Sequence, residues 1–312
     1  MPEPIVIFGY GTVGRLIAAA LLARGQPVRI AQRSRPTPLP AGATFVRCDI
    51  LDRNAVRQAM QGAGQAVLSV SFPYDAQAWR TAWPTAMTNV VEAGAEAGAR
   101  IVFIDNLYQL GPQTEPRRED MPLSDTGQKP AILSEVTRIW MAARDRVRVA
   151  ALRCSDFYGP GVSVSHLGAT GFARVAQGKT AMLFAPPDTP HDFAYVPDIA
   201  RAAVSLLDAP DDAYGQVWNM PCAPTRTPRE ILALGAAAIG VEAKLMAIPL
   251  VLLRALGFVS RFAREVADVG FTWDRPYIVD ASKFMQRFWS DVTPFETGAA
   301  ATARSFVPVR SS

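Results

Sequence analysis

The stretch Ile5-Val6-Ile7-Phe8-Gly9-Tyr10-Gly11-Thr12-Val13-Gly14 decides the fold of this chain. Its first four residues are apolar and three of them are β-branched, which is typical of a strand buried on both faces. From Arg15 onward apolar residues recur at helical spacing, so the glycines lie at a strand-to-helix turn. Gly9 permits a tight turn, Gly11 lets a pyrophosphate approach the backbone, and Gly14 lets the helix pack closely on the strand. The stretch therefore predicts a dinucleotide site at the start of a helix.

A glycine-rich turn that binds nothing is the alternative interpretation of this pattern. A second β-like run at residues 27–31 follows at the distance that a dinucleotide-binding unit requires, and it favours the binding site. The expected cofactor-binding residues of the turn are Gly9, Gly11, Thr12, Val13 and Gly14.

The residues after the second expected strand indicate which dinucleotide binds. An acidic residue there would hold the ribose 2′-hydroxyl of NAD, but the chain has Gln32-Arg33-Ser34-Arg35 and no carboxylate before Asp49. Guanidinium groups and a hydroxyl suit a 2′-phosphate. NADP is therefore favoured over NAD, with Gln32, Arg33 and Ser34 at the phosphate. The alternative is that the two arginines are simply solvated.

The composition is that of an ordinary globular protein, with 312 residues, 49% hydrophobic and 19% charged. The basic residues are scattered and the net charge is only +4, so we expect no nucleic-acid partner. Three widely spaced cysteines and two histidines, which fit no metal-ligand spacing, predict neither a disulfide framework nor a metal site.

No signal peptide precedes the first expected strand, which indicates a cytoplasmic protein. The most apolar later stretch, residues 245–259, is interrupted by Pro249 and Gly257 and is too short to span a bilayer. We expect an amphipathic surface helix there and no membrane partner, while a homodimer stays open. The polar residues of its expected outer face are Arg254, Arg261, Glu265 and Asp268.

Strands alternate with helices along the first half of the chain. This predicts an α/β fold: a Rossmann-type doubly wound parallel sheet with a smaller C-terminal substrate lobe. Residues 1–160, with 191–220 returning to the sheet, would form the dinucleotide-binding domain, and 161–190 with 221–312 the lobe. The later expected strands are 43–48, 66–70, 100–104 and 147–152, and the expected helices are 53–60, capped by Asp52, 76–97, kinked or divided by Pro84, and 132–143.

Ligands of such sheets bind at the carboxyl ends of the strands. The stretches 9–14, 69–74, 105–108 and 154–161 follow expected strands and should line one crevice. Ser69 and Ser71, at the end of the fourth expected strand, are therefore expected to contact the cofactor.

The chain resembles the extended short-chain dehydrogenase/reductase superfamily, in its NAD(P)-dependent epimerase/dehydratase branch. Besides the glycine turn, the resemblance rests on Asp49-Ile50, a pair that contacts adenine in that family, and on Arg153-Cys154-Ser155-Asp156-Phe157-Tyr158-Gly159-Pro160-Gly161. It also rests on Phe193-Ala194-Tyr195-Val196-Pro197-Asp198-Ile199-Ala200 and on Phe295-Glu296-Thr297-Gly298. These motifs span most of the chain, and they imply the fold and the cofactor class but no substrate.

Three departures mark an atypical subgroup. The glycine turn is one residue tighter than is usual in the superfamily, and the Ser or Thr expected after strand five falls at Asn106. None of the seven tyrosines has a lysine four residues on, so the Tyr-x-x-x-Lys dyad is missing. In the family, the phenol of that dyad handles the proton at the substrate oxygen. Lys129, the only lysine near the expected position, is expected to lie in solvent.

The substitute catalytic residues that we expect are Tyr108, as proton donor, and Asn106, as a hydrogen-bond donor to a substrate carbonyl. Asp105 would orient one of them. The alternative is that Tyr108 packs on the cofactor and Asn106 satisfies loop backbone groups. Tyr158 and His191 are weaker candidates. The expected function is an NADP-dependent oxidoreductase or epimerase acting on an unidentified small carbonyl- or hydroxyl-bearing substrate, and the alternative is a non-catalytic NADP sensor.

Overall fold

The computed structural model describes residues 3–184 and 186–308. Its largest sheet has seven strands in the order β10-β6-β5-β4-β1-β2-β3, and β1 pairs in parallel with both β2 and β4. The strand order reverses at β1 and β4, the point where Rossmann-type sheets bind ligands. The expected fold class is confirmed. The strands are β1 (Ile5–Phe8), β2 (Val28–Gln32), β3 (Ala43–Arg47), β4 (Gln65–Leu68), β5 (Arg100–Asn106), β6 (Arg148–Cys154) and β10 (Gln216–Asn219).

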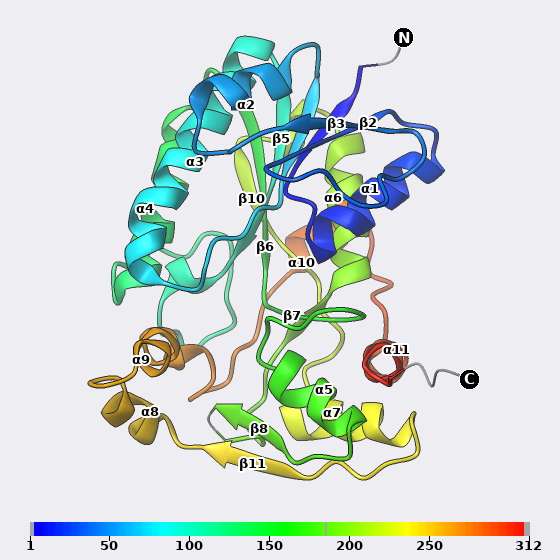
Figure 1. Cartoon of the computed structure of the whole chain (residues 1–312). Coiled ribbons are helices and arrows are strands. Elements are labelled where there is room, and N and C mark those ends of the chain that lie inside the picture. The colour runs from blue at the N-terminus through cyan, green and yellow to red at the C-terminus, as the bar shows by residue number, and fades with distance from the viewer. Residues whose placement is uncertain (1–2, 185, 309–312) are drawn as a thin grey trace. The chain divides into compact units, whose positions relative to one another are not determined.

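Helices cover both faces of this sheet (Figure 1). One face carries α1 and α6, whose C-terminal ends are joined by a hydrogen bond of 2.7 Å from Arg24 Nη1 to Asp208 Oδ2. The other face carries α2, α3 and α4. These helices are α1 (Thr12–Ala23), α2 (Arg53–Met60), α3 (Ala76–Ala97), α4 (Gln128–Ala142) and α6 (Val196–Asp208).

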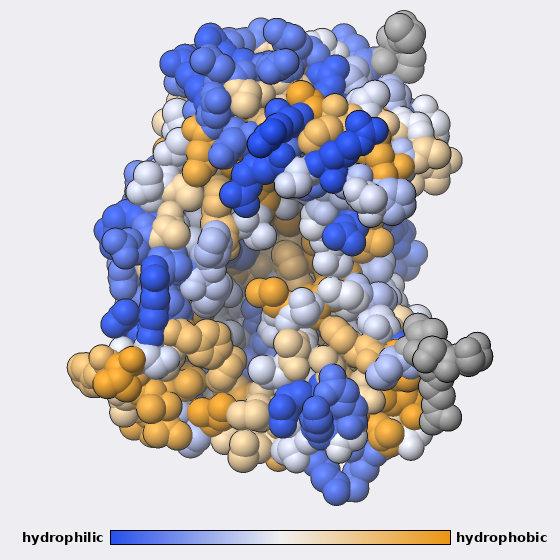
Figure 2. Space-filling model, viewed as in Figure 1, coloured by the Kyte–Doolittle hydropathy of each residue, from blue (hydrophilic) through white to orange (hydrophobic). Residues whose placement is uncertain are grey.

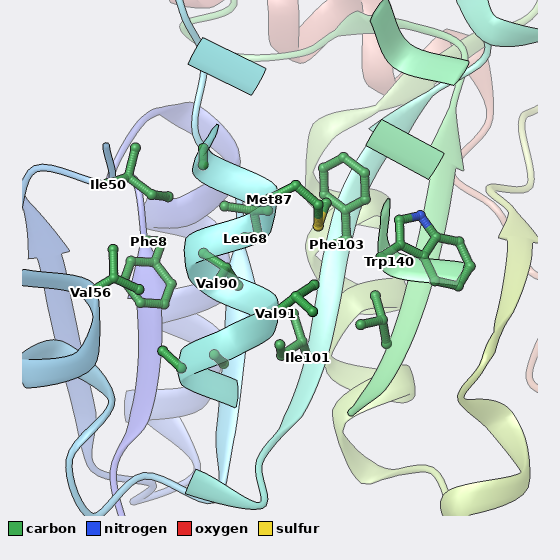
Figure 3. Close-up of a cluster of buried hydrophobic side chains, with 14 of the residues drawn as sticks. Phe8, Ile50, Val56, Leu68, Met87, Val90, Val91, Ile101, Phe103 and Trp140 are labelled. Atoms are coloured by element: carbon green, nitrogen blue, oxygen red, sulfur yellow. The ribbon is translucent and has the colours of Figure 1, made fainter. Parts of the chain in front are cut away.

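The core beneath the second face is formed by α3 against the strands. Met87, Val90 and Val91 of α3 lie over the buried side chains of the sheet, including Phe8 and Leu68 (Figure 3). Burying apolar side chains of this size contributes about 1.5–3 kcal/mol each, which makes this layer a main source of stability. The carboxyl ends of β1, β4 and β5 are thereby held in register.

We expected Pro84 to kink or divide this helix. It does not divide it, because α3 runs unbroken from Ala76 to Ala97. A proline removes one backbone hydrogen bond and crowds the preceding turn. Here Trp83 and Met87, on either side of it, are buried in the core. Their packing outweighs the local preference, and Gly98 then ends the helix in a left-handed conformation.

The cap expected at Asp52 is confirmed. The Asp52 carboxylate accepts hydrogen bonds from the amides of Asn54 and Ala55 at the start of α2. A reciprocal capping box of Thr227 and Glu230 also stands at the start of α7 (Pro228–Ala237).

The chain divides into two compact units. The first joins the described residues up to Gln109 with Leu123–Arg153 and Ile199–Trp218, and the second joins Leu110–Pro122 and Cys154–Asp198 with the described residues from Asn219 onward. Of the segment 191–220, β10 lies in the large sheet, whereas β9 (Phe193–Tyr195) pairs with β7 (Asp156–Tyr158). The domain boundaries expected from the sequence stay a prediction.

The second unit contains two small parallel pairs, β7 with β9 and β8 with β11. Its core includes Tyr158, Phe172 and Phe295. Its elements are β7 (Asp156–Tyr158), β8 (Ala181–Phe184), β9 (Phe193–Tyr195), β11 (Leu245–Ile248), α5 (Ala173–Ala176), α7 (Pro228–Ala237), α8 (Leu250–Leu256), α9 (Arg261–Asp268), α10 (Ser282–Arg287) and α11 (Phe295–Ser305).

The single surface helix expected around residues 245–259 is wrong. The structure has strand β11 followed by two short helices, because Pro249 caps the start of α8 and Gly257 follows its end. Glu265, expected on the outer face, is buried. Within residues 3–184 and 186–308, no helix combines the length and the hydropathy that crossing a membrane requires.

Candidate functional site

The glycine turn between β1 and α1 requires glycine at two positions for reasons of packing alone. Gly9 has a φ of 91°, and a Cβ there would lie 2.8 Å from the carbonyl oxygen of Ser69. A Cβ at Gly14 would overlap the carbonyl oxygen of Gly9. The turn is thus pressed against the end of β4, which brings the start of α1 to the carboxyl edge of the sheet.

Gly11 differs from its neighbours because no atom lies within 4 Å of the position that its Cβ would occupy. It is the N-cap of α1, and no side chain caps this helix. The first amide hydrogen bond back to the turn comes from Arg15, so the amides of Thr12 and Val13 stay available. Free amides and the positive end of the helix dipole suit an anion, and the space in front of Gly11 lets one approach. The turn therefore fits a dinucleotide pyrophosphate.

Gln32 connects this turn to the loop after β2. Its Oε1 accepts a hydrogen bond from the Tyr10 amide at 3.2 Å, and its Nε2 donates to the Ser34 carbonyl at 2.6 Å. Arg33 and Ser34 follow it and are exposed. Among the described residues no carboxylate pairs with Arg33. Gln32 thus positions two exposed polar residues beside the glycine turn, where a 2′-phosphate is expected.

The remaining expected cofactor residues lie at the same edge of the sheet. Asp49 is exposed, its Oδ1 accepts the Leu51 amide at 3.0 Å, and Asn89 Nδ2 donates to the Ile50 carbonyl at 3.0 Å. Ser69 Oγ donates to the Gly9 carbonyl at 2.9 Å, so this hydroxyl supports the glycine turn. The structure brings these residues together at the ends of β1, β3 and β4, and the exposed Ser71 follows two residues after Ser69.

A buried ionic cluster joins the ends of β5 and β6. Asp105 Oδ2 lies 3.4 Å from Arg153 Nε and accepts a hydrogen bond of 2.7 Å from Gln109 Nε2. The Asp105 carboxylate is engaged by Arg153 and Gln109 and also accepts a hydrogen bond from the backbone amide of Asn106. That Asp105 orients Asn106 or Tyr108 stays a prediction. Burial raises the pKa of Asp105 to about 6, against the opposing effect of the Arg153 charge.

This raised pKa predicts a pH-dependent stability. Between pH 3.8 and about 6, Asp105 is protonated in the folded protein but ionised in the unfolded chain. Because the folded state binds more protons in this window, the free energy of unfolding falls as pH rises through it. Relative to Asp105→Asn, which stays neutral, the wild type should lose up to about 3 kcal/mol of unfolding free energy between pH 4 and pH 7. Urea denaturation followed by circular dichroism measures the difference. Parallel pH profiles for the two proteins would contradict a raised pKa.

Asn106 is the last residue of β5, and Tyr108 follows two residues later. Asn106 Oδ1 accepts a hydrogen bond of 2.9 Å from the Tyr108 amide, which fixes a tight turn into a short 3₁₀ helix at Tyr108–Leu110. The Asn106 oxygen therefore satisfies a loop backbone group, while no described residue accepts a hydrogen bond from its Nδ2. The Tyr108 side chain is half-buried and packs on the core beneath α3 and α4.

Lys129 is a residue that the sequence interpretation placed wrongly. It is fully buried at the second position of α4, and its Nζ lies 4.4 Å from the ring centroid of Tyr74 and 5.8 Å from that of Trp79. A desolvated ammonium gains about 2 kcal/mol from such a ring face, which helps to offset its burial. The signal that could have revealed it is the aromatic cluster after β4, with Phe72 and Tyr74 before α3 and Trp79 within it.

The two weaker candidates lie in the second unit. Tyr158 is buried between Tyr195 and Phe295, and burial raises the pKa of its hydroxyl far above the ordinary value. His191 is buried, with its Nε2 at 3.3 Å from Asp156 Oδ2 and its ring stacked on Tyr277 at 4.8 Å. Both side chains belong to the interior of that unit.

A family model described as the NAD dependent epimerase/dehydratase family matches residues 5–220, from the first residue of β1 to the residue after β10. The chain belongs to this epimerase/dehydratase family. The matched range contains the glycine turn, the loop after β2 and the segment 105–108.

Two curated relatives of this epimerase/dehydratase chain differ in how much they cover. An uncharacterised protein of Mycobacterium tuberculosis is 37% identical over 118 residues, which are 38% of this chain but only 13% of that protein. The dTDP-6-deoxy-L-talose 4-dehydrogenase (NAD(P)(+)) of Kitasatospora kifunensis is 27% identical over 267 residues, which are 78% of this chain and 81% of the relative.

Solved structures share the fold along nearly the whole chain. The Bordetella bronchiseptica enzyme WbmH in complex with NAD⁺ has a TM-score of 0.76 at 22% identity, covering 97% of this chain and 98% of the other. The UDP-glucose 4-epimerase of Thermus thermophilus in complex with NAD has a TM-score of 0.77 at 20% identity, with the same coverage.

Helix α4 begins with Gln128, Lys129 and Pro130 and contains no tyrosine. In the parts of the chain that the structure describes, no group of three His, Cys, Asp or Glu residues could hold a metal ion. The polar groups described at this sheet edge include backbone amides, hydroxyls, the Arg33 guanidinium, the side-chain amides of Gln32 and Asn106, the Asp49 carboxylate and the buried Lys129 ammonium.

Proposed function

We propose that this protein is an NADP-preferring oxidoreductase or epimerase/dehydratase-like enzyme that acts on a small substrate bearing a carbonyl or hydroxyl group. The observation that carries the proposal is the start of α1, where uncapped amides meet open space at Gly11 beside the exposed Arg33. The nicotinamide of the bound cofactor would give or accept a hydride.

The chain's own residues would do the rest. The amides of Thr12 and Val13 would hold the pyrophosphate, and Arg33 with Ser34 would hold the 2′-phosphate. The Tyr108 phenol would donate a proton to the substrate oxygen. Asn106 Nδ2 would donate a hydrogen bond to the same oxygen as negative charge develops there.

Cofactor preference gives the first test of this proposal. Arg33→Ala should weaken NADPH binding by tenfold or more, because it removes a charge-assisted hydrogen bond of about 1.5–3 kcal/mol to the 2′-phosphate. NADH binding should change by less than about twofold, since NADH lacks that phosphate. Isothermal titration calorimetry measures both affinities.

Arg15→Ala is a matched control, because Arg15 is an exposed arginine on α1 whose Nε donates to the Tyr10 carbonyl. It should leave the ratio of the two affinities unchanged. Equal affinities for NADH and NADPH in the wild type and in Arg33→Ala would contradict the NADP preference, and NAD would then be the cofactor.

A non-catalytic NADP sensor is the second candidate, and the missing Tyr-x-x-x-Lys dyad favours it. The two are distinguished by turnover. The talose dehydrogenase and the glucose epimerase are named for nucleotide sugars, so a panel of nucleotide sugars and their keto forms is the first to assay. NADPH oxidation or NADP⁺ reduction with any of them supports the enzyme, whereas tight cofactor binding with no turnover on that panel or on simple aldehydes and ketones supports the sensor.

A further inference from the structure

An exposed apolar surface covers the hairpin of α8 and α9 in the second unit. Phe258 and Val259, in the turn between the two helices, are 90% and 87% exposed, Val251 is 73% exposed and Phe262 is 61% exposed. Figure 2 shows the hydrophobic patch at the lower left, over the place where Figure 1 draws α8 and α9. We call this surface the apolar tip. Its residues are Val251, Leu252, Leu256, Phe258, Val259 and Phe262.

The apolar tip is held by a packed base and is not a frayed end. Leu250 and Leu253 on the inner side of α8 are buried, and the Leu250 side chain lies against Gly270. On α9, Ala263 and Val266 are buried, and the ring of Phe262 lies 6.0 Å from that of Phe184. The hairpin therefore buries one apolar side and presents a second one outward.

The charged residues within the segment that forms the apolar tip are all basic. From Ala243 to Arg264 the chain contains no acidic residue, and it contains four basic ones. Arg254, Arg261 and Arg264 are exposed beside the apolar side chains, whereas the next acid, Glu265, is buried. Arg254 Nη2 lies 3.9 Å from Asp274 Oδ2, a carboxylate that also binds Arg275, so its charge is only partly balanced.

This combination of exposed apolar side chains and flanking arginines is typical of protein segments that bind at the boundary between lipid headgroups and acyl chains. Arginine stems lie along apolar surface while their guanidiniums reach anionic headgroups. A bilayer surface needs no pocket to receive a projecting turn, whereas a protein partner would need one shaped for it. No membrane-spanning helix is required for this kind of contact.

We propose that the apolar tip docks on the surface of an anionic lipid bilayer, inserting Phe258 and Val259 below the headgroups while Arg254, Arg261 and Arg264 contact lipid phosphates. This goes beyond the proposed function, because it places the second unit at a membrane surface whatever the enzyme's substrate is.

Vesicle flotation tests the proposal with the full chain. The wild type should float with vesicles of phosphatidylcholine containing 30% phosphatidylglycerol, and at least tenfold less with phosphatidylcholine alone or in 0.5 M NaCl. The double variant Phe258→Ser/Val259→Ser should lose at least tenfold in bound fraction. The control Val164→Ser, which removes an 87% exposed valine elsewhere in the second unit, should float like the wild type.

Unchanged cofactor affinity and unfolding temperature would show that the double variant is folded. A wild type that stays with the free protein at every lipid composition overturns the proposal, as does a double variant that floats equally well. Light scattering after size exclusion adds a further outcome. A wild-type oligomer that the serine pair dissociates would assign the apolar tip to an interface between copies of this chain, and that also overturns the proposal.

Discussion

Gly11→Val should abolish measurable binding of both NADPH and NADH, lowering affinity by at least 100-fold, while the protein stays folded. The backbone at this residue is extended, with φ −78° and ψ −163°, which valine adopts without strain. No atom lies within 4 Å of the position of the new Cβ, so the side chain meets no part of the described chain. It would instead fill the space through which a pyrophosphate reaches the α1 amides. Calorimetry measures the affinities, and thermal unfolding should show a loss of no more than about 1 kcal/mol from the poorer N-cap.

Gly14→Val is the contrasting variant, three residues further on. Its side chain would overlap the Gly9 carbonyl and the Ser69 hydroxyl, so we expect a loss of about 3 kcal/mol or more in unfolding free energy. The comparison thus distinguishes Gly11, where a side chain would occupy space available to a ligand, from Gly14, where it would overlap the protein itself. If Gly11→Val binds either dinucleotide as the wild type does, the glycine turn is only structural and the cofactor assignment fails.

How much of the fold could be predicted depends on whether the deciding forces are local. Buried β-branched strands and capping residues such as Asp52 act within a few residues, and they predicted the sheet and the helix starts. Pro84 misled because its local preference opposes helix, whereas the packing of Trp83 and Met87 acts across the whole layer. The stretch around 245–259 misled for a similar reason. Its apolar residues predicted a helix with one apolar face, which would be buried. In the structure some of these apolar side chains are buried, whereas others, around the turn at Gly257, are exposed.

The same distinction holds for the candidate site. The glycine turn and the loop at Gln32 are contiguous in sequence, so their chemistry can be read from spacing alone. The ion pair of Asp105 with Arg153 joins two strands 48 residues apart, and Lys129 reaches Tyr74 only because α4 begins beside the loop after β4. Neither contact has a local signature. A buried lysine at a helix start also contradicts the usual preference for acidic residues there, and residues that break such rules concentrate at functional sites.

Tyr108→Phe should lower turnover by roughly 10²- to 10⁴-fold, the usual contribution of general acid catalysis, while NADP affinity changes by less than about twofold. The reason is positional, because Asn106 ends β5 and Tyr108 follows it, at the edge where sheets of this type bind their ligands. The phenylalanine keeps the ring that packs on the core, so stability should barely change. Single-turnover kinetics with NADPH, on whichever substrate the panel identifies, measures the effect.

Tyr74→Phe is the matched comparison, because it removes a second phenol in a loop that follows a strand of the large sheet. The aromatic ring, which contacts the Lys129 ammonium, is retained in this variant, so only the hydroxyl is lost. If Tyr108 donates the proton, Tyr74→Phe should retain turnover within about threefold. The opposite pattern, with Tyr108→Phe fully active and Tyr74→Phe slowed by 10²-fold or more, would transfer the role to Tyr74 and its buried lysine. Tyr74 and Lys129 would then act together as the tyrosine and lysine of the Tyr-x-x-x-Lys dyad do, although they come from different elements of the chain. Lys129→Met should in that case lower turnover as much as Tyr74→Phe does.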